Sequence, residues 1–508
     1  MSNLGRSHSA YLPLLLRGCQ PKEESVSGNS VIPPQELRLH APLLDAYLRY
    51  FEDGITSFST PGHKQQAALL DLGLGKVVDA DIPLYGGLDE MKLTNGTLAA
   101  AEKLAAECWN ADWARFSTGG STHGNQALIL AIATPGAKIA ITRTAHRSLI
   151  SALVLGGVEP IWLTPEIDEA TGIPLGISTA ELSRALEHSP TAVFLTEPGY
   201  LGTLSPLREL IDLTHERNIP IIIDQAWGAH FGFHPGIPPH AMELGADAMV
   251  TSIHKNLPGY CAASLVVANT TRISAARLEQ SFEATHTTSP AGAPLASIDG
   301  VRALMQLRGH ELIQNLLQNI AHFKNDLKEH FGFDLFIDPD RFAPGSFDAT
   351  KLVIQTHHFG GDGVAIERAL TSHGVRVEMA DRDTIIPIVT VADDERSFTI
   401  LANALKASII AQAPRAVATA LSWRISPTFG VSIREAFFSS SEMVSAVEAA
   451  GRISADLIAP YPPGVPVVTP GEVLTQEILS GLAEVAAEGV RIAYSTDPTL
   501  ATYRVLEK

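Results

Sequence analysis

Residues 117–125 form a run of small and hydroxyl-bearing residues between an apolar strand-like segment and an apolar helix-like segment. Glycines here allow backbone N–H groups to approach an anion, and the hydroxyl groups of Ser121 and Thr122 add donors beside the positive end of a helix. The run therefore predicts a phosphate cradle. A helix N-cap formed by Ser121 or Thr122 would give the same pattern, so the run alone leaves both interpretations open.

Two ionisable residues follow later apolar strands. Asp224 ends the run 221–224, and a carboxylate at a buried strand end needs a partner such as a protonated ring nitrogen; a helix cap or loop anchor is the alternative. Lys255 follows the strand-like run 248–252. Because desolvation lowers the pKa of a lysine, its amine could act as a Schiff-base nucleophile, whereas a surface lysine beyond the strand end would have no such role.

The phosphate loop, the strand-end carboxylate and the amine are together the groups that pyridoxal 5'-phosphate requires: a phosphate anchor, a partner for its ring nitrogen and an amine for its aldehyde. The segment after Asp224 contains Trp227 and offers small residues against which a ring could rest. His146, after another strand, could stack on the exposed face of that ring, although a single histidine is more often a cap or loop residue.

Alternating strands and helices must position these residues. Strand-like runs are expected at residues 113–117, 138–142, 160–163, 192–196, 220–224 and 248–252, with helices at 123–133, 147–155, 179–187 and 207–218. This alternation predicts an α/β fold with a mostly parallel, doubly wound sheet, whose strands bring ligand-binding residues to their carboxyl ends. Residues 264–268 follow residue 252 without room for a crossover helix, which predicts an antiparallel strand.

The remaining segments predict a multidomain chain. A long helix at 294–331 leads to a smaller α+β unit with strands at 352–355, 375–379 and 385–391 and helices at 363–372 and 395–411; a further helix is expected at 475–488. We expect an arm and linker (1–75), a large cofactor-binding domain (76–330), a small α+β domain (331–412) and a C-terminal domain (413–508).

Composition limits the function classes. The 508 residues include 37 Lys and Arg against 55 Asp and Glu, a net charge of −18, which argues against a nucleic-acid partner. The three cysteines show neither metal-ligand spacing nor a disulfide framework, so we expect no metal and a cytoplasmic location. No apolar run approaches the roughly 18 residues of a membrane span.

The sequence resembles the basic amino acid decarboxylases (ornithine, lysine and arginine) of the aminotransferase-like fold type I, from about residue 55 to the C-terminus. The resemblance rests on Thr60-Pro61-Gly62-His63-Lys64, Ser121-Thr122, Ala145-His146-Arg147-Ser148, Glu197-Pro198-Gly199-Tyr200, Asp224 with Trp227, Ser252-Ile253-His254-Lys255, Thr287-Thr288-Ser289-Pro290, Glu378-Met379-Ala380-Asp381, Arg434-Glu435-Ala436-Phe437, Gly451-Arg452-Ile453-Ser454 and Pro462-Pro463-Gly464 with Pro470-Gly471-Glu472.

The resemblance implies roles for these residues. Lys255 would hold the cofactor as a Schiff base and Asp224 would pair with its ring nitrogen. His146 would stack on the ring, while Ser121, Thr122, Ser252 and His254 would surround the phosphate. Lys255 or His254 would return a proton to the substrate. Residues Thr288 and Ser289 would reach the site of a neighbouring subunit, which predicts a homodimer or a dimer of dimers.

The resemblance also implies a C-terminal decarboxylase-type domain, a place in polyamine biosynthesis and a basic amino acid as substrate. We expect no receiver-like N-terminal domain such as longer members have, and short members include arginine decarboxylases, so arginine is favoured slightly over lysine and ornithine. A distal cation needs a carboxylate nearby, for which Glu378 and Asp381 are the first candidates, then Asp89 and Glu90, then Glu283. Each of these acids could equally be a solvated loop charge.

Two departures from the family pattern, at residues 256–261 and 84–90, leave the substrate open. The competing functions are an aminotransferase or another lyase on the same fold, and a catalytically silent regulatory homologue that binds the cofactor or a partner.

Overall fold

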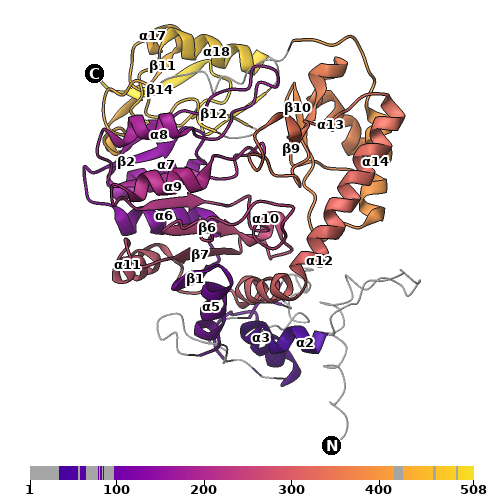
Figure 1. Cartoon of the computed structure of the whole chain (residues 1–508). Helices are drawn as coiled ribbons and strands as arrows, with labels where there is room; N and C mark the ends of the chain where they lie inside the picture. The colour runs from indigo at the N-terminus through magenta and orange to yellow at the C-terminus, as the bar shows by residue number, and fades with distance from the viewer. Residues whose placement is uncertain are drawn as a thin grey trace, which may run out of the picture.

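A computed structural model describes residues 34–508, apart from residues 55, 57, 65–77, 79, 83, 85–87, 89–95, 417–426, 462–464 and 488–489. Figure 1 shows a central sheet with helices on both faces, a second unit joined to it by a long helix, and a C-terminal unit beside the α7–α8 end of the sheet. Residues 1–33 of the predicted arm and linker (1–75) lie outside the described residues, as do the candidates Asp89 and Glu90.

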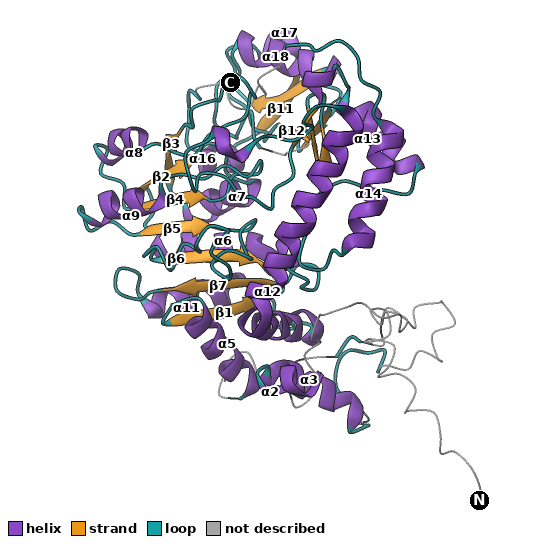
Figure 2. Ribbon diagram, turned by 45° about the vertical axis from the view of Figure 1, so that its right-hand side comes forward, coloured by secondary structure: helices purple, strands orange, loops and turns teal. Residues whose placement is uncertain are grey.

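A seven-stranded sheet forms the centre of the molecule, with strand order β1-β7-β6-β5-β4-β2-β3. Figure 2 shows these strands one above another. The strands are β1 (Trp113–Ser117), β2 (Lys138–Thr142), β3 (Glu159–Leu163), β4 (Ala192–Thr196), β5 (Ile221–Asp224), β6 (Ala248–Ser252) and β7 (Ser264–Ala268). Strand β7 is antiparallel to both of its neighbours, and all other pairs are parallel. The predicted doubly wound sheet and its antiparallel strand are confirmed.

Alternate residues of the strands pack on opposite faces of this sheet. Val193, Ile221 and Met249 belong to one hydrophobic core, whereas their neighbours Phe194 and Ile222 belong to another. The first core includes side chains from α3 (Pro42–Glu52), α5 (Thr97–Cys108), α8 (Thr179–Leu186), α9 (Leu207–His215) and α12 (Gly292–Phe331). The second includes side chains from α6 (Gly120–Ile132), α7 (Arg147–Gly156) and α11 (Ala275–Thr285). Short helices α2 (Pro34–Leu39) and α10 (Ile253–Asn256) complete this part.

Helix α12 continues into the second unit, where its end packs against α14. This unit contains the antiparallel strands β8 (Ile354–Gln355), β9 (Met379–Ala380) and β10 (Thr384–Ile386), the helices α13 (Gly363–Ser372) and α14 (Glu395–Ser408), and the 3-10 turns η3 (Pro339–Arg341) and η4 (Thr356–Phe359). The strands predicted at 375–379 and 385–391 were placed wrongly in part, because most of those residues lie outside the short ladder that forms.

The C-terminal unit has its own small core. It contains α16 (Ile433–Phe438), β11 (Ser441–Ser445), α17 (Ala446–Ala449), β12 (Ala459–Tyr461), α18 (Gln476–Ala487), β13 (Arg491–Ala493) and β14 (Thr502–Leu506). Strand β11 pairs with β14 and β12 with β13, both antiparallel.

Candidate active site

Asp224 and Lys255 follow the carboxyl ends of adjacent parallel strands, β5 and β6. The carboxylate of Asp224 is buried and accepts two hydrogen bonds: Asn125 Nδ2 donates to Oδ2 at 2.8 Å, and the N–H of Ala226 donates to Oδ1 at 3.1 Å. These two hydrogen bonds fix the orientation of the carboxylate.

Lys255 lies in the short helix α10, which directly follows β6. Its Nζ lies 4.2 Å from the centroid of the Trp227 ring. Burial lowers the pKa of Lys255, and the negative charges of Asp224 and Glu378 oppose this change. A lowered pKa increases the fraction of uncharged amine, which is the nucleophilic form.

His146 forms the N-cap of α7. Its Nδ1 accepts a hydrogen bond from the N–H of Ser148 at 3.2 Å and lies 2.9 Å from Ser148 Oγ, which itself accepts from Asn125 Nδ2 at 2.9 Å. These contacts make Nδ1 an acceptor, so the proton of the neutral ring belongs on Nε2. Loss of hydration lowers the pKa of His146; Asp224 opposes this, while the charges of Lys255 and Arg147 add to it. A neutral ring with an exposed surface suits stacking on a flat cofactor.

The N-terminus of α6 lies beside the end of β6. Helix α6 begins at Gly120, earlier than the predicted residue 123, so Ser121 and Thr122 are in its first turn, where N–H groups have no acceptor within the helix. Gly119 is the N-cap, which excludes the alternative that Ser121 or Thr122 caps the helix. Ser121 Oγ lies 2.6 Å from Ser252 Oγ, whereas the Thr122 side chain is exposed.

Close packing of α6 on the sheet depends on Gly124. A Cβ at this position would lie only 2.4 Å from Cγ2 of Val250, in β6. The absence of a side chain therefore lets the first turn of α6 approach Ser252. Next to it, His254 Nδ1 donates to the carbonyl of Ala263 at 3.0 Å, which leaves Nε2 for a ligand.

The other predicted residues lie around this cluster. Thr288 and Ser289 are exposed between α11 and α12, and Glu283 is exposed on α11. Glu378 is exposed, and its charge partly opposes the lowering of the Lys255 pKa. Asp381 accepts from the N–H groups of Asp383 at 2.9 Å and Thr384 at 2.7 Å, so its carboxylate closes the turn between β9 and β10.

Sequence reasoning missed Asn125, Ser148, Tyr200 and Lys351 as site residues. Asn125 was visible as a polar residue in an apolar helix, but its contact with Asp224 joins residues far apart in the chain. Tyr200 packs edge-on against Trp227, with ring centroids 5.4 Å apart, and Lys351 Nζ lies 4.2 Å from the Trp227 centroid. These contacts depend on tertiary packing that no spacing along the chain indicates.

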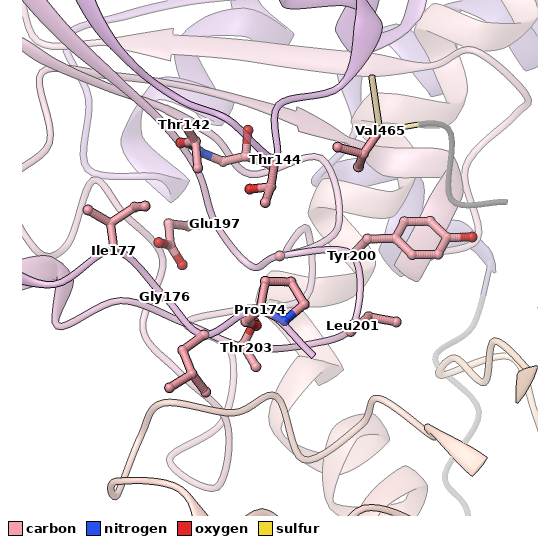
Figure 3. Close-up of a pocket in the computed structure, with 13 residues that line it drawn as sticks. Thr142, Thr144, Pro174, Gly176, Ile177, Glu197, Tyr200, Leu201, Thr203 and Val465 are labelled. Atoms are coloured by element: carbon pink, nitrogen blue, oxygen red, sulfur yellow. Dashed lines mark hydrogen bonds between the residues drawn. The ribbon is translucent and has the colours of Figure 1, made fainter. Parts of the chain in front are cut away.

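A small cavity lies beside the site, at the ends of β2 and β4. Figure 3 shows Glu197 among Thr142, Thr144, Thr203 and Pro174, with the ring of Tyr200 extending away from the Glu197 carboxyl group. Its volume of about 20 Å³ holds one water molecule but no amino acid. Burial raises the pKa of Glu197 to about 7, although Ser205 donates two hydrogen bonds to the carboxylate.

Within the described residues, no group of three or more His, Cys, Asp or Glu side chains could hold a metal ion. No helix in the described part of the chain is both long and apolar enough to cross a membrane.

The donor set fits pyridoxal phosphate. The first turn of α6 with Ser121 and Ser252 would cradle the phosphate, the carboxylate of Asp224 would face the ring nitrogen, and the amine of Lys255 would meet the aldehyde. The fold and the site together define a pyridoxal-phosphate-dependent enzyme of the aminotransferase-like fold type I.

Comparison with known proteins identifies the family. Residues 41–397 match the Orn/Lys/Arg decarboxylase major domain, and residues 427–487 match the C-terminal domain of the same family. The chain belongs to this family and is a carboxy-lyase. An arginine decarboxylase of Halalkalibacterium halodurans is 30% identical over 483 residues, which cover 92% of this chain and 98% of the relative. The inducible lysine decarboxylase of Escherichia coli is 23% identical over 549 residues, covering 86% of this chain and 75% of the relative.

A solved structure with the same fold is the constitutive lysine decarboxylase of Escherichia coli. It has a TM-score of 0.77 and 21% identity, and the match covers 92% of this chain and 82% of that one. The fold-type assignment made from the sequence is confirmed.

Proposed function

We propose that this enzyme decarboxylates arginine to the corresponding amine and carbon dioxide. The observation that carries the proposal is the placement of the desolvated Lys255 amine beside the buried Asp224 carboxylate, at the ends of adjacent strands. Membership of the decarboxylase family supports the reaction. The arginine decarboxylases among its relatives, such as the one that is 30% identical across 92% of this chain, support the substrate.

Pyridoxal phosphate, when bound, supplies an electron sink for the charge that remains on Cα after carbon dioxide leaves. Asp224 would hold a proton at the cofactor ring nitrogen, because its carboxylate is buried and held in a fixed orientation by hydrogen bonds from Asn125 and Ala226. The Ser121 and Ser252 hydroxyls, with the first turn of α6, would bind the phosphate. Trp227 would border the reacting groups, since the amine of Lys255 lies against its ring.

Two histidines complete the proposed machinery. The neutral ring of His146 would cover one face of the cofactor and exclude water, held in place by Ser148. His254 Nδ1–H donates to the carbonyl of Ala263, so its Nε2 would be free to accept or pass on a proton. Either the amine of Lys255 or His254 Nε2 would return a proton to Cα.

We propose Glu378 as the partner of the distal cation of the substrate. Its charge already acts on both Lys255 and Lys351, which places it within electrostatic range of the reacting amine. Asp381 is the weaker candidate because its carboxylate accepts two backbone N–H groups.

Exposed Thr288 and Ser289 support the further proposal that they complete the site of a second subunit in a homodimer or a dimer of dimers. A cytoplasmic location, a role in polyamine biosynthesis and the domain boundaries stated above remain proposals of the same kind.

The test is a product assay. Purified enzyme with pyridoxal phosphate is incubated with arginine, lysine, ornithine and the neutral analogue norleucine, and carbon dioxide, amines and 2-oxo acids are measured. Arginine should give the highest kcat/KM. The Glu378→Gln variant should have a higher KM for arginine and a cofactor spectrum close to that of wild type. Release of a 2-oxo acid in place of carbon dioxide, or equal turnover of norleucine, would contradict the proposal.

A further inference from the structure

Lys351 is a buried cation at the site that the proposed reaction does not use. Its side chain is 7% exposed and lies just before β8. Nζ lies 4.2 Å from the centroid of Trp227 and 5.1 Å from that of Tyr200. Within the part of the chain that the structure describes, this Nζ has no ion-pair or hydrogen-bond partner, and the two aromatic faces only partly replace its lost hydration.

A rigid turn holds Lys351 in this place. Thr350 donates to Oδ1 of buried Asp348 through its N–H at 2.9 Å and its Oγ1 at 2.7 Å, and His230 Nε2 lies 2.9 Å from Thr350 Oγ1. The N–H of Lys351 donates to the carbonyl of Asp348 at 3.0 Å. Gly202 faces the stem of Lys351 so closely that a Cβ there would lie 2.9 Å from its Cβ and Cγ. The segment before β8 is therefore fixed against the loops of the large sheet.

The charges around Lys351 leave it cationic near neutral pH. Burial lowers the pKa of Lys351 to about 8; Asp348 and Glu378 oppose this, while Lys255 adds to it. A buried ammonium without a paired anion is costly, so an anionic group bound at the site would stabilise it.

We propose that the Lys351 ammonium binds the α-carboxylate of the amino-acid substrate. Lys255 Nζ and Lys351 Nζ both lie 4.2 Å from the Trp227 centroid, so the two nitrogens are separated by no more than twice that distance. The α-amine of the substrate would take the place of Lys255 Nζ, and its carboxylate carbon, two bonds from that amine, would lie on the side of Lys351. The inference rests on the proposed function because it requires an amino acid in this position.

The same cation orients the substrate. Lys351 repels a guanidinium or ammonium group, so the distal end of the substrate must turn away from it and toward a carboxylate such as Glu378. The pairing with the carboxylate is present when the substrate binds and is lost as carbon dioxide leaves. It therefore strengthens substrate binding and does not favour the transition state over the bound substrate.

The experiment compares substrate with product, because the product amine lacks the carboxylate. In Lys351→Met, KM for arginine should rise by about 10- to 100-fold, the loss expected for a hydrogen bond to a charged group. The inhibition constant of the product amine should not rise above that of wild type, because the amine has no carboxylate for Lys351 to bind. Lys351→Arg should retain most of the binding, and cofactor affinity should be unchanged in both variants.

Lys324→Met is the matched control. Lys324 is also partly buried, and its Nζ lies 5.5 Å from the centroid of the Phe336 ring, but it belongs to α12 and lies outside the site. It should change neither constant. If Lys351→Met does not fold, both constants are measured for the wild-type enzyme as a function of pH. At pH values above about 8, KM for arginine should increase, whereas the inhibition constant of the amine should not.

Equal increases in KM and in the inhibition constant, or a loss of cofactor affinity, would overturn the assignment of Lys351. Wild-type enzyme that turns over no basic amino acid would overturn the proposed function instead.

Discussion

Asp224 is held by donors on two sides, and its charge is the feature that the proposed chemistry depends on most. Asp224→Ala removes the group that would keep the cofactor ring nitrogen protonated, so kcat should fall by roughly 10²–10⁴-fold, the range for proton-managing groups. Steady-state kinetics at saturating cofactor measure the change.

Asp247→Ala is the control for burial alone. Asp247 is another buried carboxylate, but it lies before β6, where it pairs with His215 at 2.9 Å and Arg272 at 3.1 Å. This variant should lose thermal stability while its folded fraction keeps the wild-type kcat. If the kcat of Asp224→Ala were close to that of wild type, Asp224 would have only a structural role.

Glu197 makes the stability of the enzyme depend on pH. Burial raises its pKa to about 7, above the ordinary value near 4.5, so the folded chain keeps a proton that the unfolded chain loses. Stability from this group is complete below the unfolded pKa and is lost as pH rises through about 7. The loss is about 3 kcal/mol at most, because the pKa difference sets its size.

Glu197→Gln cannot ionise, so its Tm should fall less than that of wild type between pH 5.5 and pH 8.5. Thermal unfolding at the two pH values measures the difference, and Glu187→Gln, at an exposed position, should behave as wild type. The same decline in Tm for Glu197→Gln and wild type would show that Glu197 is not the responsible group.

At the residue scale, the sequence predicted those groups whose chemistry follows from their position after a strand. Asp224 and Lys255 were found because each follows a buried apolar run. Lys351 was not found, because it follows no such run and reaches Trp227 only through the packing of one unit against another. Asn125 and Ser148 were not predicted for the same reason: the hydrogen bonds of Asn125 connect α6 to Ser148 in α7 and to Asp224 in β5, which are far apart in the sequence.

At the scale of elements, a buried ion pair ties β2 to the C-terminal unit. Arg143 Nη1 lies 2.8 Å from Glu472 Oε1, with side chains 3% and 0% exposed, and Arg143 Nη2 donates to the carbonyl of Val467 at 2.8 Å. Thr469 Oγ1 also donates to Glu472 at 2.7 Å. Removing one partner of such a pair leaves an uncompensated buried charge, which costs about 3–5 kcal/mol.

Glu472→Gln should therefore lower Tm and speed proteolysis within the C-terminal unit. Glu442→Gln, which breaks the more exposed pair with Arg452, should change Tm little. The double variant Arg143→Met/Glu472→Leu should recover part of the loss, because it removes both charges. An effect of Glu472→Gln no larger than that of Glu442→Gln would refute this role.

The elements themselves were predicted unevenly. The strands of the large sheet are buried on both faces, so their continuous apolar runs stand out, and the short link between residues 252 and 264 identified the antiparallel strand. In the second unit, β9 and β10 are two and three residues long, too short for a pattern of alternation to set their limits. Helix α11 was missed because most of its residues are polar and it buries only a narrow face.

For the whole molecule, three units meet around the site. The large sheet supplies Asp224 and Lys255, the second unit supplies Lys351 and Glu378, and the C-terminal unit is tied to the end of β2, three residues before His146. A shift between the units would move Lys351 and Glu378 relative to Lys255. With the proposed roles, the arrangement of the units would set substrate binding, whereas residues of the large sheet would hold the cofactor.

The exposed segment between α11 and α12 has a proposed role in the active site of a second subunit. If Thr288 and Ser289 complete the site of a partner subunit, two inactive variants with defects on opposite sides of the interface should complement each other. Lys255→Ala lacks the amine, and Ser289→Tyr blocks the contributed segment. An equal mixture should regain up to about a quarter of wild-type activity, because half of the randomly formed dimers are mixed and each mixed dimer has one intact site.

Activity is measured after subunit exchange verified by differently tagged chains. Lys255→Ala mixed with Lys324→Met controls for exchange itself: its recovered activity should follow the share of intact Lys255 sites alone. A mixture of Lys255→Ala and Ser289→Tyr that exchanges subunits and stays inactive would mean that each chain builds its site alone. The exposed loop would then have no part in the active site, and dimerisation would have to be explained by another surface.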